Sequence, residues 1–437
     1  MKTIKISQAK SSQDIRVRIS GWLHRVVKPE KNLVTVIIRD GTGYLQAILN
    51  DKKCQANNNI QLTPESTITL CGVITKVPEE RSVPGGLEFV CDYWKLIGSA
   101  PAGGIEAVIK QGASVDTLLD NRHLVVRNEE TSKILKVQSH VLHAIRNHFF
   151  ERDCHEVTPP CLVQFDFECC GSAFDINYFG KQVYLSPSNE PYLEMCLPAL
   201  GNVFCISKSY RAEQRITRRH LAEFTHVQTQ YGFITFNDLL DYMEDFICDV
   251  VDKVMKSTAG QFIKDLNPDF KFPKRPFRRM DYTEAIAYLK EHGITKQDGS
   301  YYELGEDISE EPERKMIDKI NEPLLLCRFP AKTVPFYIPT CPENREYTES
   351  VDLLMPNVGE IAGGSTKLDN YEELLEAYKK CDIDPCVYYW YSDLRKYGTC
   401  PHGGYGLGLE RLLTWLCNQH NIRDVCLCPR FIDRCSP

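Results

Sequence analysis

The chain has 437 residues, of which 25% are charged and 43% hydrophobic, and its formal net charge is −7. These proportions are typical of a globular protein and exclude a largely disordered one, and no apolar run is long enough to predict a membrane span. The length predicts two or three domains. The negative charge excludes a surface that is basic throughout, so any polyanion would have to meet a local basic patch.

The cysteines do not predict a disulfide framework or a metal centre. There are 19 of them, an odd number in a long chain whose first residues, MKTIKISQAKSS, lack the apolar core of a signal peptide. Neither Cys426 and Cys428 with Cys435 nor the adjacent Cys169 and Cys170 has zinc-ribbon spacing. We therefore expect reduced thiols, no zinc site and a cytoplasmic protein.

The first hundred residues predict a small β domain. Asp40-Gly-Thr-Gly43 is a strong hairpin signal between two strand-like segments. Five strands over this length are compatible with an oligonucleotide-binding barrel, which we expect at residues 1–98, followed by a Pro/Gly-rich linker at residues 99–116. The five strand-like segments are residues 15–23, 33–39, 44–49, 66–76 and 87–97.

Residues 117–437 mix helical and strand patterns and predict a second, α+β domain. Apolar residues at helical spacing predict one helix over residues 134–150, and another from Asp238 to about Lys256 with Asn237 as its N-cap. Short strands are expected at residues 155–158 and within 183–210, interrupted by a helix at 192–200.

Residues 257–347 are the least regular part of this domain. They contain a basic run from Lys271 to Arg279 and an acidic run from Glu303 to Glu313. We interpret this segment as an insertion that packs against a sheet.

The stretch from Ser209 to Gln230 predicts a β-hairpin, in which the Tyr-Arg-Ala-Glu residues 210–213 belong to the first strand and a basic loop follows them. Arg211 would offer a planar guanidinium to a phosphate, Glu213 an acceptor to an exocyclic amine, and Phe224 a flat face to a purine. Taken alone, the stretch fits a solvated surface hairpin better, because short motifs often occur by chance.

Two later segments carry further candidates for nucleotide chemistry. Asp352 and Glu360 flank a Pro-Asn turn and could hold Mg²⁺ with nucleotide phosphates, or could simply be surface acids. A glycine-rich strand ends with Gly408 and Arg411 before an apolar helical run, 412–416. It has no surrounding βαβ unit, so it is not a Rossmann fingerprint.

In this order, the helix and strand ending at Pro159, the Tyr-Arg-Ala-Glu hairpin and the strand ending at Arg411 resemble the three signature motifs of class II aminoacyl-tRNA synthetases. The N-terminal barrel restricts the resemblance to the aspartate, asparagine and lysine subclass. The segments LLDNRHLVVR, ESVDLLMPNVGEIAGGS and YGTCPHGGYGLGLER are similar to eukaryotic-type asparaginyl-tRNA synthetases. The resemblance implies an antiparallel catalytic sheet flanked by helices and a dimer through the Pro159 segment. We expect the long N-terminal extension of eukaryotic members to be absent.

The resemblance also implies an ATP- and Mg²⁺-dependent reaction. A carboxylate attacks the α-phosphorus of ATP and forms an acyl-adenylate and pyrophosphate. Arg211 and Arg411 are implied as catalytic residues, and Asp352 and Glu360 as Mg²⁺ ligands. The implied ATP-binding residues are Arg211, Glu213, Arg219, His220, Leu221, Phe224, Asp352, Glu360, Gly408 and Arg411.

The implied substrate pocket departs from the family pattern. Cys169 and Cys170 replace two glycines, Glu190 replaces a glutamine, Gln228 replaces an acid and Lys367 replaces an arginine. Lysine does not reproduce the bidentate fork of arginine. The substrate-binding residues implied by the family are Glu168, Ser188, Glu190, Glu194, Gln228, Ser365 and Lys367.

The implied anticodon face departs too, because Val27, Glu30 and Thr35 occupy places where relatives have arginines, a glycine and a stacking phenylalanine. We therefore interpret the chain as an adenylate-forming paralogue with an altered substrate, which passes the acyl group to a small amine or ammonia. It would be an amide ligase or an asparagine synthetase-like enzyme, with tRNA binding in doubt. The alternative is an ordinary asparagine–tRNA ligase in which other residues compensate.

Overall fold

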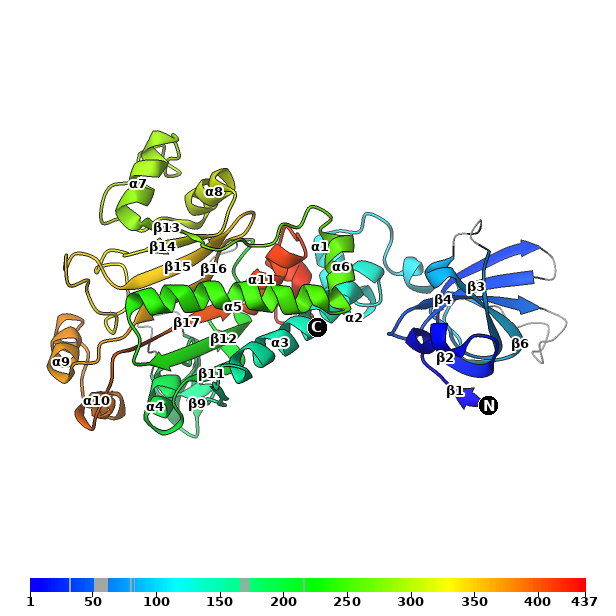
Figure 1. The fold of residues 1–437 in the computed structure, drawn as a ribbon, viewed down its shortest axis with the longest axis horizontal. Coiled ribbons are helices and arrows are strands. Elements are labelled where there is room, and N and C mark those ends of the chain that lie inside the picture. Colours follow the sequence, from blue (N-terminus) through cyan, green and yellow to red (C-terminus); the bar gives the residue numbers. More distant parts are fainter. Residues whose placement is uncertain are drawn as a thin grey trace. The chain divides into compact units, whose positions relative to one another are not determined.

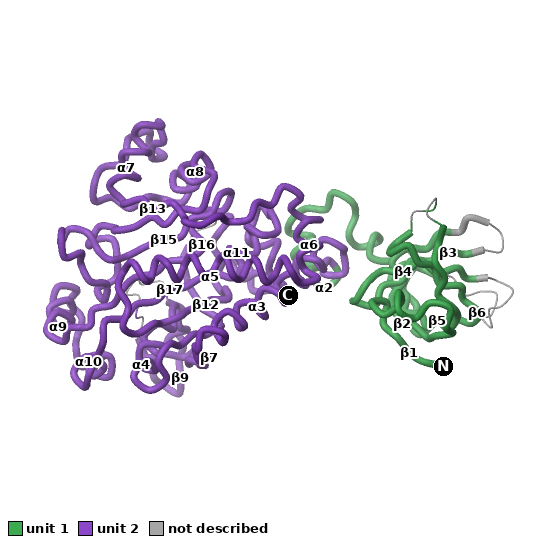
Figure 2. The backbone as a smooth tube through the Cα atoms, viewed as in Figure 1, with its two compact units in different colours: residues 1–124 green, residues 125–437 purple. Residues whose placement is uncertain are grey.

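The computed structural model describes residues 1–30, 33–50, 62–78, 81, 83–165, 167, 173–214 and 217–437. The chain forms two compact units, residues 1–124 and 125–437 (Figure 2). Within the described ranges, no helix is both long and apolar enough to cross a membrane. The exact limits expected for the barrel, the linker and the insertion stay predictions.

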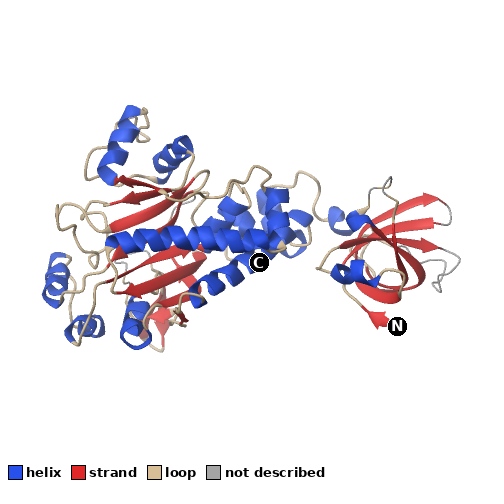
Figure 3. Ribbon diagram, in the orientation of Figure 1, coloured by secondary structure: helices blue, strands red, loops and turns tan. Residues whose placement is uncertain are grey.

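The first unit is a β-barrel of the expected kind (Figure 3). Its strand order is β1-β2-β3-β4-β6-β5, and the long strand β2 also pairs with β5, which closes the sheet. Apolar side chains such as Ile19, Val36 and Phe89 fill its interior because they alternate with outward residues along each strand. The strands are β1 (Lys2–Thr3), β2 (Arg16–Glu30), β3 (Leu33–Arg39), β4 (Tyr44–Asn50), β5 (Thr67–Lys76) and β6 (Leu87–Gly98). The helices α1 (Val115–Asp120) and α2 (Arg122–Val125) come next in the sequence.

The second unit is built on an eight-stranded, mostly antiparallel sheet with the order β13-β14-β15-β16-β17-β12-β11-β7. Its strands are β7 (His155–Glu156), β11 (Val203–Tyr210), β12 (Glu223–Gly232), β13 (Arg278–Asp281), β14 (Leu324–Cys327), β15 (Ser350–Met355), β16 (Gly359–Thr366) and β17 (His402–Gly408). A small separate sheet contains β8 (Leu162–Val163), β10 (Lys181–Leu185) and β9 (Asp175–Tyr178). The α+β class inferred from the sequence is confirmed.

Long amphipathic helices pack on the large sheet and close its main core (Figure 1). α5 crosses the sheet in Figure 1 and packs against α3, and residues of both helices belong to one apolar cluster. The helices of this unit are α3 (Glu129–Phe150), α4 (Glu190–Leu200), α5 (Phe236–Lys256), α6 (Ala259–Leu266), α7 (Tyr282–Glu291), α8 (Glu310–Ile320), α9 (Tyr371–Lys380), α10 (Tyr389–Lys396) and α11 (Leu409–Leu416).

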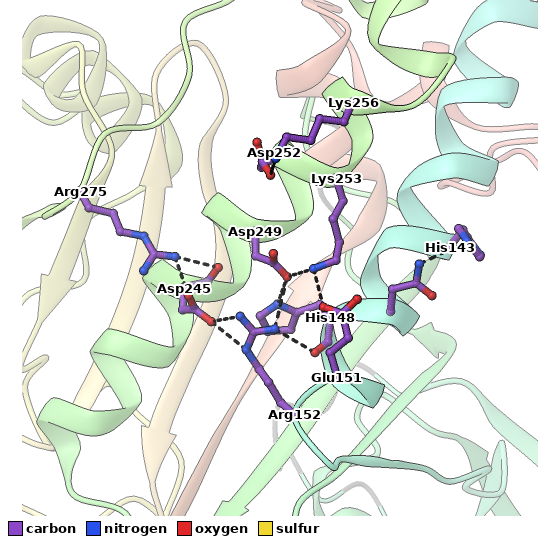
Figure 4. A network of polar contacts seen from close by, with 11 residues as sticks. His143, His148, Glu151, Arg152, Asp245, Asp249, Asp252, Lys253, Lys256 and Arg275 are labelled. Atoms are coloured by element: carbon purple, nitrogen blue, oxygen red, sulfur yellow. Dashed lines mark hydrogen bonds and ion pairs between the residues drawn. The ribbon is translucent and has the colours of Figure 1, made fainter.

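A polar network joins α3 to α5 at the rim of this core (Figure 4). His148 Nδ1 lies 2.7 Å from Asp249 Oδ2, although the histidine side chain is almost fully buried. Arg152, just after α3, forms ion pairs with both Asp245 and Asp249, and Lys253 pairs with Asp249 at 2.5 Å. The network therefore ties two helices together that are about a hundred residues apart in the sequence.

The expected cap of α5 is wrong. The helix begins at Phe236, and Thr235 rather than Asn237 is its N-cap. Thr235 Oγ1 accepts a hydrogen bond from the amide of Asp238, whose carboxylate accepts one from the amide of Thr235 at 2.8 Å. This reciprocal pair satisfies two free amides at the helix start, so the helix begins two residues earlier than the sequence predicted.

Two other details of the second unit differ from expectation. β11 ends at Tyr210, whose partner is Glu223, so Arg211 lies in the connection between the strands and not within a strand. The irregular segment 257–347 does more than pack against a sheet, because it contributes β13 and β14 to the sheet itself. Short strands of this kind are hard to recognise in a sequence rich in charge and proline.

Candidate active site

The floor of the candidate site is formed by two neighbouring strands, β12 and β17. Gln228 and Gln230 of β12 lie directly opposite Gly406 and Gly404 of β17. A Cβ atom on Gly406 would lie 2.3 Å from Nε2 of His226, and one on Gly404 would lie 1.9 Å from the carbonyl oxygen of Thr229. The absence of side chains at these two alternating positions of β17 therefore makes room for atoms of β12.

A cavity above this floor gathers nine of the ten residues expected to bind ATP. Asp352 is the exception and lies on the neighbouring strand β15. His226, Ile361, Gly406, Glu410 and Ile422 also line the cavity and were not expected. The gathered residues are Arg211, Glu213, Arg219, His220, Leu221, Phe224, Glu360, Gly408 and Arg411.

Arg211 and Phe224 lie together at one side of the cavity. The guanidinium carbon of Arg211 is 5.5 Å from the centroid of the Phe224 ring, within the range of a cation–π contact. The backbone of Arg211 is held by a hydrogen bond from its amide to the carbonyl of Ala222. A fixed cation beside a flat ring suits a ligand that carries both phosphates and a purine.

Glu360 and Arg411 form the other side of the cavity. Glu360 Oε1 lies 2.9 Å from Arg411 Nη1, and Glu360 Oε2 lies 3.6 Å from Arg219 Nη2. Burial alone would raise the pKa of the Glu360 carboxyl, but the two arginines hold that pKa at about 2. Glu360 is therefore ionised at neutral pH.

Glu313 is a member of this charge cluster that sequence reasoning missed. It projects from α8, and its Oε1 lies 2.7 Å from Arg219 Nη1 with both side chains largely buried. Burial lowers the pKa of Arg219, but Glu313 and Glu360 outweigh that effect and raise it. The acidic run before Glu313 was visible in the sequence, but nothing local showed which of its residues turns inward.

Asp352 has the environment of a carboxylate that would gain from a nearby cation. Its burial, together with the negative charges of Glu360 and Glu313, raises the pKa of the Asp352 carboxyl well above its ordinary value. No group of three or more His, Cys, Asp or Glu residues among the described positions could hold a metal by itself. Asp352 and Glu360 fit Mg²⁺ only if ligand oxygens complete its coordination.

His226 and Glu410 are buried polar residues of the cavity that the sequence did not single out. Burial lowers the pKa of His226 to about 3, with Arg211 and Arg411 adding to the effect, so this imidazole is neutral. Its Nδ1 is 3.0 Å from Ser209 Oγ. Glu410 accepts a hydrogen bond from the amide of Thr225 at 2.9 Å. The two-residue spacing of His226 from Phe224 could have revealed it, because alternate residues of a strand share a face.

The residues expected to bind the amino-acid substrate lie deeper in the fold, and three of them meet. Lys367 Nζ lies 2.6 Å from Glu190 Oε2 and donates a hydrogen bond to Ser365 Oγ at 2.9 Å. The ammonium also lies 4.7 Å from the ring centroid of Tyr337. All three charged or hydroxyl side chains are buried, so Glu190 and Lys367 neutralise each other inside the protein.

Ser188 and Gln228 form a second small group. Gln228 Nε2 donates to Ser188 Oγ at 2.8 Å, and Gln228 Oε1 accepts from the amide of Asn189 at 2.9 Å. The neutral amide of Gln228 thus binds the start of α4. Glu168, also expected in this pocket, lies outside the described residues, as do Cys169 and Cys170.

Glu194 is engaged in a separate buried network. Its carboxylate accepts hydrogen bonds from the Tyr391 hydroxyl at 2.9 Å and from Arg395 Nη2 at 2.5 Å, and it lies 3.0 Å from His402 Nε2. Burial opposes ionisation, but Arg395 and His402 lower the pKa of Glu194 to about 2. Because these protein side chains engage its carboxylate, we assign Glu194 a supporting role next to the pocket.

Residues 114–432 match the family described as tRNA synthetases class II (D, K and N), and residues 17–97 match the OB-fold nucleic acid binding domain. The chain therefore belongs to the class II tRNA synthetases, and it is an ATP-dependent ligase. It is 55% identical over 436 residues to the cytoplasmic asparagine–tRNA ligase of Bos taurus, covering 100% of this chain and 78% of that protein.

Two further proteins give the same result. The cytoplasmic asparagine–tRNA ligase of Homo sapiens is 54% identical over 436 residues, covering 100% of this chain and 80% of that protein. The solved asparaginyl-tRNA synthetase of Entamoeba histolytica in complex with asparaginyl-adenylate has a TM-score of 0.94 and 40% identity, covering 100% of this chain and 99% of that one.

These findings overturn the interpretation of the chain as a paralogue that acylates a small amine or ammonia. The likeness to asparagine–tRNA ligases extends over the whole chain and includes the nucleic-acid binding domain. That interpretation was wrong because we treated Glu190 and Lys367 as two independent departures from the family's substrate pocket. In the structure the two residues form one ion pair, so the changes compensate each other.

The doubt about tRNA binding is corrected as well. It rested on Val27, Glu30 and Thr35, of which Val27 and Thr35 pair across β2 and β3. The same strand β2 also exposes Trp22 and Arg25, which supply a flat ring and a cation elsewhere on the barrel. Departures from the family pattern at three positions therefore do not remove a nucleic-acid surface. The dimer expected through Pro159 stays a prediction.

Proposed function

We propose that this protein is a cytoplasmic asparagine–tRNA ligase, which activates asparagine with ATP and transfers it to tRNA. The observation that carries the proposal is the full-length likeness to cytoplasmic asparagine–tRNA ligases, at 55% identity over 436 residues. The neutral substrate pocket and the arginine-rich cavity support it, because each suits one of the two small substrates.

In the first step, the cavity holds ATP while the asparagine carboxylate attacks the α-phosphorus. Arg211 binds the α-phosphate and Phe224 stacks under the adenine, since the two groups lie together at 5.5 Å. Arg411 and Arg219 bind the far phosphates. Positioning and charge neutralisation supply the catalysis, and no covalent bond to the protein forms.

Arg411 and Arg219 need not change place to do this. Both are held by Glu360, and Arg219 also by Glu313. The carboxylates keep the guanidinium groups in position before the ligand arrives, which reduces the reorganisation that binding requires. Mg²⁺, when bound, would neutralise charge on the phosphates and would be held by Asp352 and Glu360.

The amino-acid pocket suits a carboxamide better than a carboxylate. Lys367 is neutralised by Glu190, so it offers no uncompensated cation to an aspartate side chain. Gln230 is fully buried, and neither its Oε1 nor its Nε2 has a hydrogen-bond partner within the described part of the chain. A buried amide with an unused donor and acceptor matches a second amide, which offers the complementary pair.

The test is ATP–pyrophosphate exchange with asparagine, aspartate, glutamine and β-alanine as separate substrates. We expect exchange with asparagine and at least about a hundredfold less with aspartate, because a carboxylate would enter a neutral pocket without a partner. Exchange that is fastest with aspartate, or absent with asparagine, would refute the proposal.

A further inference from the structure

A groove on the catalytic unit is lined by a basic segment that the proposed adenylation does not use. Residues of the run from Lys271 to Arg278, which follows α6 and ends on the first residue of β13, form one wall. Trp415 of α11 and Asn357, in the turn between β15 and β16, lie on other walls. The groove thus collects basic, aromatic and amide side chains from three distant parts of the chain.

The arginines of this segment fasten it to α5. Arg275 Nη2 lies 2.6 Å from Asp245 Oδ1, as Figure 4 shows, and Arg279 forms an ion pair with Asp241. Both acids belong to α5. Ion pairs within the protein therefore account for Arg275 and Arg279, but not for the lysines of the segment.

The lysines of the segment behave differently. Lys271 and Lys274 line the groove, are exposed, and form no ion pair with any described residue. Arg278 also lines the groove but has Glu322 at 4.0 Å, and Asp269 adds a second acid to the lining. The two lysines are therefore the charges in the groove that are available to an incoming anion.

Between these lysines lies an exposed aromatic ring. Phe272 is 51% exposed, and its ring centroid is 5.7 Å from that of Phe270. Phe270 in turn contacts Trp415 at 5.2 Å, which anchors the aromatic row to α11. Exposed rings beside free lysines are the combination that binds single-stranded nucleic acid, with phosphates on the cations and bases on the rings.

The groove lies beside a path that leads to the candidate ATP cavity. Asn357 belongs both to the groove and to a small neighbouring cavity, which also contains Arg218 and Arg411. Arg218 Nη2 donates to the carbonyl of Asn357 at 3.3 Å, and Arg411 lines the ATP cavity itself. Positive groups therefore continue from the groove to the site of chemistry.

We propose that this groove binds the acceptor arm of tRNA, with Lys271 and Lys274 on its phosphates and Phe272 stacked on an unpaired base. The inference rests on the proposed function, which requires the 3′ end of a tRNA to reach the catalytic unit. The matched nucleic-acid binding domain, residues 17–97, lies in the other unit, so the catalytic unit needs its own contacts to the acceptor arm.

The test compares two charge-reversed variants of the full chain. The groove variant is Lys271→Glu with Lys274→Glu, and the control is Lys290→Glu with Lys380→Glu, which changes two exposed lysines of α7 and α9 and gives the same net charge. Affinity is measured for an asparagine tRNA transcript and for a minihelix of its acceptor arm, between 50 and 200 mM salt. ATP–pyrophosphate exchange is measured in parallel.

We expect the groove variant to bind both RNAs about tenfold more weakly, with a salt slope lower by about 2, because two phosphate contacts are lost. Phe272→Ala should weaken binding about tenfold with an unchanged slope. Exchange should be unaffected in all variants, and the control should bind like the wild type.

Equal binding by the groove and control variants would overturn the proposal. So would a loss that appears with the whole tRNA but not with the minihelix, because the groove would then meet another part of the RNA. In either case, wild-type charging of tRNA would leave the proposed function intact. Failure of the wild-type protein to charge any tRNA would refute the proposed function, and with it the basis of this inference.

Discussion

Arg211 is the residue on which adenylation depends most in this account. It lies in the connection between β11 and β12, with its guanidinium carbon 5.5 Å from the ring centroid of Phe224. We predict that Arg211→Ala slows ATP–pyrophosphate exchange by about 100-fold or more, because a fixed charge on the reacting phosphate is lost. Lys208→Ala, on the preceding strand β11, where Lys208 Nζ donates to Thr225 Oγ1, is the matched control and should retain exchange. Near-normal exchange in Arg211→Ala would mean that the α-phosphate binds elsewhere.

The ion pair of Glu190 and Lys367 gives a second prediction at the scale of single residues. Glu190→Gln leaves a buried ammonium without its partner, and we expect it to lower the free energy of unfolding by about 3 kcal/mol. The double variant Glu190→Gln with Lys367→Met removes both buried charges, so that no ion is left without its partner. Urea unfolding should show the double variant closer to the wild type than Glu190→Gln alone. A double variant as unstable as the sum of its single changes would show that the two positions are independent.

Sequence reasoning succeeded and failed at this scale for physical reasons. Residues such as Phe224 and Arg411 belong to motifs that resemble those of a known family, and that resemblance was enough to predict that they meet in one cavity. Glu190 and Lys367 are 177 residues apart, and only the fold reveals that they compensate each other. Glu313 was missed for the same reason, because its partner Arg219 comes from a different element.

At the scale of elements, β17 depends on its glycines. Gly404→Ala would place a Cβ atom 1.9 Å from the carbonyl oxygen of Thr229 on β12, and backbone atoms cannot yield without disturbing the strand pair. We predict a loss of about 3 kcal/mol in unfolding free energy, or loss of soluble protein. Gly232→Ala is the control, because its nearest contact is an ordinary 3.4 Å to Cys400 Sγ. Equal stability of the two variants in urea would contradict the packing described here.

The contact between α3 and α5 should make stability depend on pH. Burial lowers the pKa of His148 below its ordinary value of 6.5, although Asp249 opposes this effect. Below about pH 6.5, His148 therefore binds a proton in the unfolded chain but not in the folded one. Its contribution to the free energy of unfolding is fully present above about pH 6.5 and decreases as the pH falls below that value. We expect urea unfolding midpoints to fall between pH 7 and pH 5. The fall should be smaller in His148→Asn, and an unchanged slope in that variant would assign the effect to other groups.

The elements themselves were predicted unevenly. The strands of the barrel and the long helices α3 and α5 follow clear periodicity, so the sequence located them well. β13 and β14 have four residues each and carry little periodic signal. β14 pairs with β15, and β13 pairs with β14, and these long-range contacts are not contained in local patterns.

In the whole molecule, nucleic-acid binding and the candidate active site belong to different units. The barrel matches a nucleic-acid binding domain, and the second unit contains the arginine-rich cavity and the neutral pocket. The formal net charge of −7 means that tRNA must be recognised by local surfaces, since the protein as a whole repels it. From the sequence we expected any polyanion to meet a local basic patch, but we gave too little weight to exposed residues of the barrel such as Trp22 and Arg25.

The decisive experiment is the charging of an asparagine tRNA transcript with radiolabelled asparagine by the purified full chain. We expect ATP-dependent formation of asparaginyl-tRNA, little product with aspartate, and loss of product in Arg211→Ala. Asparaginyl-adenylate that forms but is never transferred to the tRNA would contradict the account, as would charging with aspartate in preference to asparagine.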